Sequence, residues 1–512
     1  MSVTSRLNSR APIVAALLAR AAARGSAVAI SGEDSTLTYR ELIDGAVAIA
    51  ESLLAEGLTP HQTVHVRVSN VPSDFVALIG IWLAQGVAVP LHRSSPPAAV
   101  DLIRQRSHAA FEVDSLATAK TDRIKRTATV PADGEAQAIL ANAALVIFTS
   151  GSTGIPKGVV LSHTALAGKL AANDSLLHFD ANDRILLVLN NSFSFGIWVS
   201  LLTILKGGVL VTRSRFSADN FLRDLQLEGV TRVGVVPTMM RTLFAGSVPK
   251  GVDLPELRQI LIGGESLGHS LSKTLRKTFH AAELIDIYGL TETATSDFFL
   301  FPQDYKQHPN AVGHPGLNVS FRIADPDNKP LPNGQVGELQ IRSPYLMNGY
   351  LGDPKTTADT LVDGWLRTGD LAFTSDGRFV EIAGRRKELI VRGGNKVYPL
   401  EIEQHIAAHP AVREALAVGV ADTILGERIH ALIILRSKQD ADFTNLRRFL
   451  ADRLDRFKLP DAIYVGTTLP LGSTGKADRG QLARLIREGA IAPAWQHKGA
   501  QTSPSPSLSD ST

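Results

Sequence analysis

Residues 148–158, FTSGSTGIPKG, combine glycines, hydroxyl side chains and a lysine in a way that suits phosphate binding. Glycine lets backbone N–H groups curl around phosphate oxygens, serine and threonine add donors, and lysine adds positive charge. The segment follows an apolar run at 144–148, which is typical of a buried strand. We therefore predict a phosphate-binding loop, with an ordinary surface hairpin as the alternative. The candidate ligands are Thr149, Ser150, Gly151, Ser152, Thr153, Gly154 and Lys157.

The loop differs from the phosphate loop of nucleoside triphosphatases on both sides of its lysine. That loop places lysine directly after glycine and before a serine or threonine that binds Mg²⁺. Here Lys157 follows Pro156 and precedes Gly158. The loop therefore lacks the signature of that class of enzyme, while the general physics of phosphate binding still applies.

The same segment resembles the phosphate-binding signature of the adenylate-forming superfamily. This superfamily includes acyl-CoA synthetases, peptide-synthetase adenylation domains and beetle luciferases. Further resemblances follow in the family's order, in LTYREL (37–42), IYGLTET (287–293), GELQIRSPYLMNGY (337–350), DGWLRTGDLA (363–372), GRRKELIVRGGNKVYPLEIE (384–403) and LPLGSTGKADR (469–479). Because they recur in order from residue 37 to residue 479, the chain is identified as a member of this superfamily.

The resemblance implies roles for the nucleotide-binding residues of IYGLTET. Tyr288, with Gly289, would stack on adenine, Thr291 would bond the α-phosphate, and Glu292 would bind Mg²⁺. A hard oxygen ligand beside a triphosphate is what Mg²⁺ requires. Without the resemblance, a single glutamate at a loop end is usually only solvated.

Other motifs imply contacts to the rest of the nucleotide and to the acid. Asp370 would accept both ribose hydroxyls, and Arg385 would reach the ribose or the phosphates. Gly264 and Glu265 resemble the loop beside the acyl and adenine pockets, although the glycines there are also compatible with a plain turn.

The C-terminal motifs imply a division between two chemical steps. Lys476 would bridge the substrate carboxylate and the α-phosphate, which calls for a positioned cation. Gly393 and Gly394 would let a pantetheine arm approach the backbone, because they lack side chains. The texture of residues 391–403 is closer to acyl-CoA synthetases than to peptide-synthetase domains, which favours CoA as the acceptor.

The segment LNNSFSFGIW (189–198) corresponds to the acid pocket and departs from both comparisons. Amino-acid-activating domains usually carry an aspartate there, and this chain offers Ser192, Ser194 and Gly196. Burying an ammonium group without a carboxylate partner is costly, so an α-amino acid substrate is disfavoured. The histidine common in acyl- and aryl-CoA synthetases is also missing. The aromatic residues of the segment suggest an apolar or aromatic lining but are equally compatible with plain core.

These features predict an AMP-forming acid–thiol ligase that uses ATP, Mg²⁺ and CoA. A carboxylic acid would attack the α-phosphate, pyrophosphate would leave, and the acyl-adenylate would pass its acyl group to CoA. An acyl carrier protein or another nucleophile is the alternative acceptor. A luciferase-like oxygenase and an inactive binding module remain further alternatives, although Lys476, Glu292 and Asp370 argue against the second.

Composition limits the function classes in other ways. The 53 basic and 50 acidic residues are interleaved, so a net charge of +3 does not suggest a nucleic-acid partner. The absence of cysteine excludes disulfides, thiolate metal sites and cysteine nucleophiles, and is compatible with a cytoplasmic location. We expect no membrane span, because no stretch approaches about 20 apolar residues. Residues 1–25 are interpreted as including an amphipathic helix rather than a signal peptide.

Alternating strand-like and helix-like segments predict an α/β fold with several domains. Apolar runs at 27–32, 63–68, 184–189, 207–212, 230–237 and 257–264 alternate with helical patterns such as 38–58 and 73–86. This order predicts parallel-type sheets covered by helices, and residues 319–343 predict a small β subdomain. We expect a large N-terminal domain over 1–383, a small α+β C-terminal domain over 384–490 and a disordered tail over 491–512. The resemblance implies that the small domain is mobile and turns about a joint within 376–387.

Overall fold

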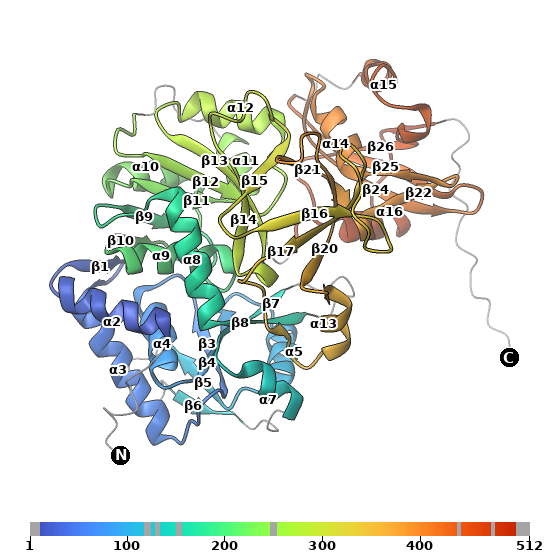
Figure 1. Cartoon of the computed structure of the whole chain (residues 1–512). Coiled ribbons are helices and arrows are strands. Elements are labelled where there is room, and N and C mark those ends of the chain that lie inside the picture. The colour runs from blue at the N-terminus through green and yellow to red at the C-terminus, as the bar shows by residue number, and fades with distance from the viewer. Residues whose placement is uncertain are drawn as a thin grey trace.

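A computed structural model describes most of the chain as a large α/β domain followed by a smaller domain (Figure 1). The large domain runs from blue to yellow in Figure 1, and the small domain is orange to red. The expected class, a large N-terminal domain and a small C-terminal one, is confirmed. The described residues are 11–116, 124–127, 134–149, 156–245, 253–437, 442–472 and 477–497.

A seven-stranded sheet carries the strand that leads into the predicted phosphate loop. Its four central strands run parallel, and antiparallel strands complete both edges. The central strands are buried apolar runs, as expected for a sheet covered on both faces. In order across the sheet, the strands are β18 (Gly349–Tyr350), β8 (Lys157–Ser162), β7 (Ala143–Thr149), β4 (Val87–His92), β3 (Thr63–Val68), β5 (Phe111–Asp114) and β6 (Ile124–Arg126).

A fourteen-stranded sheet carries most of the other candidate residues. Its parallel half comprises β1 (Val28–Ser31), β10 (Val209–Thr212), β9 (Arg184–Leu187), β11 (Arg232–Val235), β12 (Gln259–Gly263) and β13 (Glu283–Leu290), with β2 (Thr36–Thr38) antiparallel at the edge. The antiparallel half comprises β14 (Thr295–Leu300), β15 (Ala311–Pro315), β21 (Val380–Arg385), β20 (Trp365–Phe373), β17 (Gly337–Arg342) and β16 (Ser320–Ala324), with β19 (Leu361–Val362) beside β20. The small β subdomain predicted at 319–343 corresponds to the pair β16–β17, which is continuous with the fourteen-stranded sheet.

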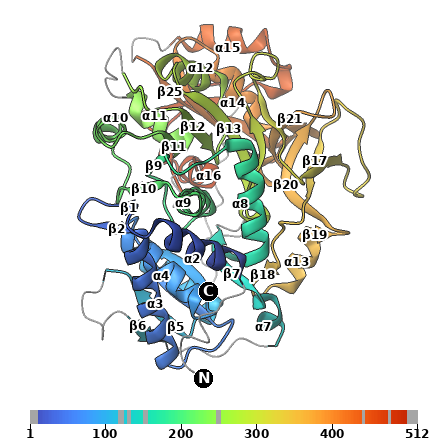
Figure 2. The same ribbon diagram turned by 60° about the vertical axis from the view of Figure 1, so that its left-hand side comes forward.

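Helices pack against both sheets of the large domain. The largest apolar cluster joins residues of both sheets to α2, α3, α4, α8 and α9, so the two sheets share one core (Figure 2). The predicted N-terminal amphipathic helix is α2, which buries Ile13, Val14 and Leu17. The helices are α2 (Pro12–Arg24), α3 (Tyr39–Ala55), α4 (Pro72–Leu83), α5 (Pro97–Ser107), α7 (Gly134–Leu140), α8 (His163–Leu177), α9 (Ser194–Lys206), α10 (Ala218–Leu227), α11 (Pro237–Ala245), α12 (His269–Thr278) and α13 (Pro354–Thr360). Within the described ranges, no helix is both long and apolar enough to cross a membrane.

The small domain is a six-stranded sheet with helices on both faces. Apolar side chains of α14 and α15 pack on one face and those of α16 on the other. The strands are β22 (Ile390–Arg392), β23 (Asn395–Val397), β24 (Val412–Asp422), β25 (Gly426–Leu435), β26 (Ala462–Gly466) and β27 (Trp495–Gln496). The helices are α14 (Pro399–Ala407), α15 (Phe443–Ala451) and α16 (Arg479–Arg487), with short 3₁₀ turns η2 (Arg386–Glu388) and η4 (Arg456–Lys458).

The predicted start of the C-terminal tail, at residue 491, is wrong. Residues 491–497 belong to the small domain, because β27 pairs with β26 and the backbone N–H of His497 donates to the carbonyl of Asp461. Trp495 packs on the domain core and under Arg447, which gives this short strand an anchor. Residues 498–512 lie outside the described part. The boundary at 383/384 remains a prediction, and β21 of the large sheet continues to Arg385.

Candidate active site

The motif IYGLTET forms the end of β13 and a 3₁₀ turn, η1 (Thr291–Thr293). Gly289 is required where β13 meets β14, because a Cβ atom there would lie 2.1 Å from the carbonyl oxygen of Thr295. The register between the two strands also shifts here, between Tyr288 and Gly289. The strand end therefore presents Tyr288, then a side-chain-free position, and then the polar turn.

Tyr288, Asp370 and Arg385 form a connected group across three strands. Asp370 of β20 lies opposite Arg385 of β21 in the antiparallel ladder. The Tyr288 hydroxyl donates to Asp370 Oδ2 at 2.6 Å, and Arg385 Nε lies 3.1 Å from Asp370 Oδ1. Burial and the adjacent Asp370 carboxylate both raise the pKa of Tyr288, so its hydroxyl remains a donor at neutral pH. Asp370 also raises the pKa of Arg385, and the Arg385 side chain keeps 49% of its surface exposed.

Glu292 is joined to the phosphate-loop strand through Tyr350. The Tyr350 hydroxyl donates to Glu292 Oε1 at 2.8 Å, and Lys157 Nζ lies 5.0 Å from the centre of the Tyr350 ring. Burial, followed by the nearby Glu292 charge, raises the pKa of Tyr350. The backbone N–H of Met347 also donates to the Glu292 carbonyl at 2.8 Å. The hydrogen bond from Tyr350 to Oε1 therefore orients the Glu292 carboxylate, and Oε2 is left for another ligand.

Thr291 faces Ser194 at the start of helix α9, and the predicted acid-pocket segment at 189–198 runs into this helix. The hydroxyl oxygens of Thr291 and Ser194 lie 3.3 Å apart. Asn191, just before the helix, donates its side-chain amide to the buried Asp74 at 3.0 Å, which fixes this segment to α4. Phe195 stacks on the buried Trp198 at 5.8 Å, so at least one face of this aromatic pair belongs to the core.

Gly264 and Glu265 follow β12 in a tight turn. Gly264 has a φ of +88°, a left-handed conformation that favours glycine. The Glu265 carboxylate accepts the Thr238 hydroxyl at 2.8 Å and lies 3.1 Å from Arg241. Internal partners from α11 therefore already bind the Glu265 carboxylate, so its described role is to link this turn to that helix.

The structure describes only the two ends of the predicted phosphate loop. Thr149 ends β7 and pairs with Lys157 at the start of β8. Ser150, Gly151, Ser152, Thr153 and Gly154 lie outside the described residues, as does Lys476. Thr149 and Lys157 thus locate the two ends of the predicted loop, and Lys157 lies beside Tyr350. The roles predicted for the loop residues and for Lys476 remain predictions.

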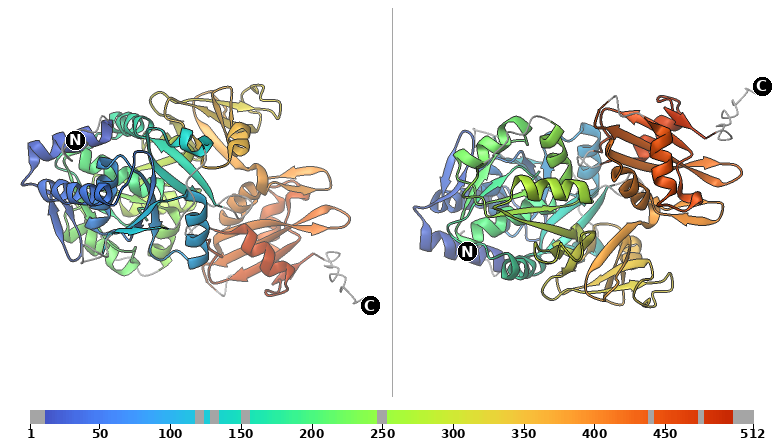
Figure 3. Two further views of the ribbon diagram at one scale, coloured as in Figure 1. Left: turned by 90° about the horizontal axis from the view of Figure 1, so that it is seen from below. Right: turned by 90° about the horizontal axis from the view of Figure 1, so that it is seen from above.

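Gly393 and Gly394 are not brought to the site in this structure. They form the turn between β22 and β23, with φ values of +56° and +80°. The β22–β23 and β24–β25 hairpins project from the side of the small domain away from the large domain (Figure 3). The backbone N–H of Gly393 donates to the Leu425 carbonyl at 2.7 Å, which holds the two hairpins together.

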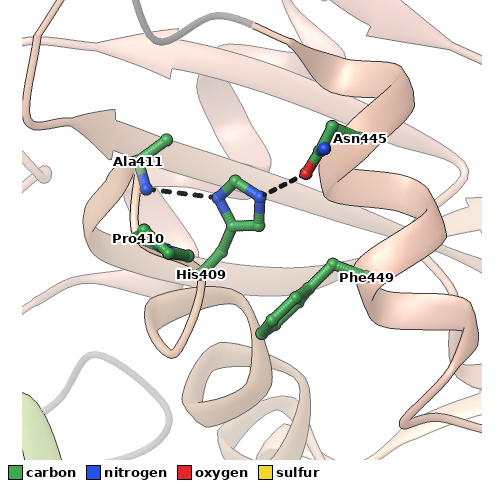
Figure 4. A pocket seen from close by; sticks show the side chains of 5 residues that line it. All are labelled: His409, Pro410, Ala411, Asn445 and Phe449. Carbon is green, nitrogen blue, oxygen red and sulfur yellow. Dashed lines mark hydrogen bonds between the residues drawn. The ribbon is translucent and has the colours of Figure 1, made fainter.

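A shallow hollow on the small domain is separate from these residues (Figure 4). His409 at its centre has both ring nitrogens occupied: Asn445 Oδ1 lies 2.9 Å from Nε2, and the Ala411 N–H lies 3.3 Å from Nδ1. Phe449 packs edge-on against the ring. This histidine is therefore a satisfied structural residue and not a candidate for catalysis.

Tyr350 and Arg479 make contacts that could not be predicted from the sequence. Tyr350 lies within a motif quoted above, but its bond to Glu292 spans 58 positions and has no local signal. Arg479, at the start of α16, binds both oxygens of Glu403 and pairs with Glu388 at 3.2 Å. Burial raises the pKa of Glu403 to about 7, with Arg479 opposing that shift.

Comparison with known proteins agrees with the geometry. A family model described as AMP-binding enzyme matches residues 17–351, and one described as AMP-binding enzyme C-terminal domain matches residues 401–476. Feruloyl-CoA synthase of Amycolatopsis is 31% identical over 477 residues, covering 90% of this chain and 96% of that protein. A fatty acid–acyl-carrier-protein ligase of Streptomyces coeruleorubidus is 29% identical and covers 89% and 92%.

A solved structure of similar shape is o-succinylbenzoate-CoA synthetase from Bacillus subtilis in complex with an acyl-adenylate. The TM-score is 0.78, the identity is 25%, and the match covers 91% of this chain and 97% of that protein. The fold and the site thus define an adenylate-forming ligase of the acid–thiol type. The chain belongs to the AMP-binding enzyme family.

Proposed function

We propose that this chain activates a non-amino carboxylic acid with ATP and transfers the acyl group to CoA. The observation that carries the proposal is the junction of β13, β20 and β21, where Tyr288, Asp370 and Arg385 interlock beside Glu292. Asp370 would accept the ribose hydroxyls, and the Tyr288 ring, fixed by its hydroxyl and by Phe298, would provide a flat face for adenine. The related CoA ligases support the class of acceptor.

Glu292 suits a magnesium ligand. It has a carboxylate oxygen not used by Tyr350, and within the described ranges no three His, Asp or Glu side chains gather into a metal cluster of their own. The nucleotide phosphates would therefore supply the other ligands, as is usual for Mg²⁺. Bound there, Mg²⁺ would offset negative charge on the phosphates.

In the first step, a carboxylate oxygen would form a bond to the α-phosphorus while the bond to the β-phosphate oxygen breaks. Lys157 would neutralise charge at the phosphate loop, Thr291 would hold the α-phosphate, and Lys476 would stabilise the charge that builds up between acid and phosphate. In the second step, the thiol sulfur of CoA would bond to the acyl carbon and AMP would leave. We also propose a cytoplasmic location, since the absent cysteines fit a reducing compartment.

Nucleotide chromatography tests the proposed first step. The enzyme is incubated with ATP, Mg²⁺ and a panel of aryl, fatty and dicarboxylic acids, and acid-dependent AMP and pyrophosphate are expected. ADP as the main product would contradict the proposal. The acceptor is tested separately by offering CoA or a phosphopantetheinylated carrier protein, because one relative is an acyl-carrier-protein ligase. If a thioester forms with the carrier protein and not with CoA, the carrier protein is the acceptor and the CoA part of the proposal is wrong.

A further inference from the structure

A buried ion pair lies directly behind the turn that carries Thr291 and Glu292. Lys169 of α8 approaches Asp297 of β14 with an Nζ–Oδ1 distance of 2.5 Å, and the two side chains are 1% and 0% exposed. Desolvation makes such a pair a poor source of stability compared with apolar residues of similar size. Its presence in the core therefore calls for an explanation beyond stability.

The other oxygen of Asp297 anchors the turn itself. Asp297 Oδ2 accepts a short hydrogen bond from the hydroxyl of Thr293, the last residue of η1. Thr293 is fully buried and its hydroxyl also contacts the backbone of Leu290. The next residue, Ala294, has a φ of +65°, a costly conformation for alanine that persists only where surrounding contacts impose it.

Lys169 extends the same connection to the opposite side of Glu292. Its Nζ lies 5.5 Å from the centre of the Tyr345 ring. Two residues further along, the Met347 N–H donates to the Glu292 carbonyl at 2.8 Å. Both routes from the ion pair therefore end at the backbone that carries Glu292.

We propose that Lys169 and Asp297, acting through Thr293, are positioning residues that fix Thr291 and Glu292 for magnesium and nucleotide binding. This inference rests on the nucleotide role proposed for those two residues. The predicted acid-pocket segment touches this turn through Ser194, 3.3 Å from Thr291, but its own anchor is a separate contact, from Asn191 to Asp74. Loss of the anchor should therefore impair the use of Mg²⁺ and ATP and leave acid binding nearly unchanged.

The large domain supplies a matched control pair away from the site. Arg232 and Asp183 form another buried ion pair, 2.8 Å apart, at the opposite ends of the strands. The Thr231 hydroxyl donates to Asp183 Oδ1 at 2.7 Å. Thr231→Val thus removes a hydroxyl-to-carboxylate bond of the same kind as Thr293→Val, without touching the candidate site.

The experiment compares Thr293→Val, Thr293→Ser and Thr231→Val in ATP–pyrophosphate exchange with a turned-over acid. For Thr293→Val we expect the half-saturating Mg²⁺ concentration or the KM for ATP to rise about 10-fold or more, because misplaced ligands are costly. The KM for the acid should stay within about twofold. Thr293→Ser restores the hydroxyl and should behave like the parent enzyme. Thr231→Val should lower the melting temperature only.

A second variant covers the case in which Thr293→Val does not fold. Lys169→Met combined with Asp297→Leu replaces the ion pair by apolar side chains, which is often neutral for stability, and removes the oxygen that accepts the Thr293 hydroxyl. We expect the same selective loss for Mg²⁺ and ATP. Folded variants whose Mg²⁺ and ATP constants stay within about twofold of the parent overturn the inference, as does an equal effect of Thr231→Val. If the parent makes no acid-dependent AMP, the proposed function fails, and unchanged MgATP dissociation constants in these variants would still overturn the inference.

Discussion

Replacing Asp370 by asparagine tests the proposed ribose contact with a defined magnitude. The Asp370 side chain is 5% exposed, and its two oxygens lie 2.6 Å from the Tyr288 hydroxyl and 3.1 Å from Arg385 Nε, so its position is fixed before ATP arrives. Asparagine keeps the shape and one acceptor oxygen but removes the charge and the second acceptor. Arg385 is half-exposed and stays hydrated, so the loss of its carboxylate partner adds little to the free-energy cost of the substitution.

The expected loss corresponds to one hydrogen bond to a charged group. Such a bond contributes about 1.5–3 kcal/mol, and about 1.4 kcal/mol is a factor of ten, so the KM for ATP should rise about 10- to 100-fold. The parent enzyme should also discriminate against 2′-deoxy-ATP and 3′-deoxy-ATP. Asp370→Asn should lose the discrimination against one of the two deoxy nucleotides, because one of the two acceptor oxygens is gone.

Steady-state AMP release with the three nucleotides measures both effects. Tyr288→Phe serves as the control, because it removes a hydroxyl bound to Asp370 and keeps the carboxylate. That variant should still discriminate against the deoxy nucleotides. If Asp370→Asn discriminates as strongly as the parent enzyme, Asp370 does not bind the ribose and the proposed placement of ATP is wrong.

Four further outcomes follow from the same site and from the small domain. Lys476→Ala should lower acyl-adenylate formation by a factor of about 10²–10³ while still converting supplied acyl-adenylate and CoA to acyl-CoA; equal slowing of both steps would contradict this. Gly394→Leu should hinder thioester formation and spare adenylation, whereas Gly489→Leu, which has a similarly strained and open backbone position, should affect neither step. Non-amino acids should be activated better than their α-amino counterparts, since residues 192–196 contain no carboxylate, and an amino acid as the best substrate would refute this. Burial lowers the pKa of His430 to about 4, so below its ordinary value of 6.5 the unfolded chain binds a proton that the native chain does not. Acidification from about pH 7 to about pH 5 should therefore cost the parent about 2 kcal/mol more unfolding free energy than His430→Gln, measured by urea titration, and an equal loss in both would contradict this.

Local patterns predicted the elements well, because burial and periodicity leave a clear signal along the chain. The run TVHVRV became β3 over Thr63–Val68, and the helical pattern at 38–58 became α3, which is capped by Thr38 and Glu41. The short strand β27 escaped prediction because two paired residues carry no periodicity, and its stability comes from Trp495 packing on a distant core.

The candidate site was predictable where motifs carry it and not where distant residues meet. Tyr288, Asp370 and Arg385 were predicted individually, and the structure brings them into contact. The bond between Lys169 and Asp297 spans 128 positions, and neither residue stands out in the sequence. Such contacts depend on how α8 crosses the sheet, which no local pattern specifies.

Strand β21, which carries Arg385 of the proposed nucleotide site, also leads into the predicted joint between the domains. Arg385 is the last residue of β21, and η2 begins at the next residue. Arg385 pairs with Asp370 and lies within the predicted joint at 376–387, so a change at the Asp370 carboxylate acts on the joint directly. The proposed nucleotide site and the predicted joint between the domains would thus both depend on Arg385. If the proposed nucleotide role holds, departure of AMP would act on the predicted joint through the Asp370–Arg385 contact itself.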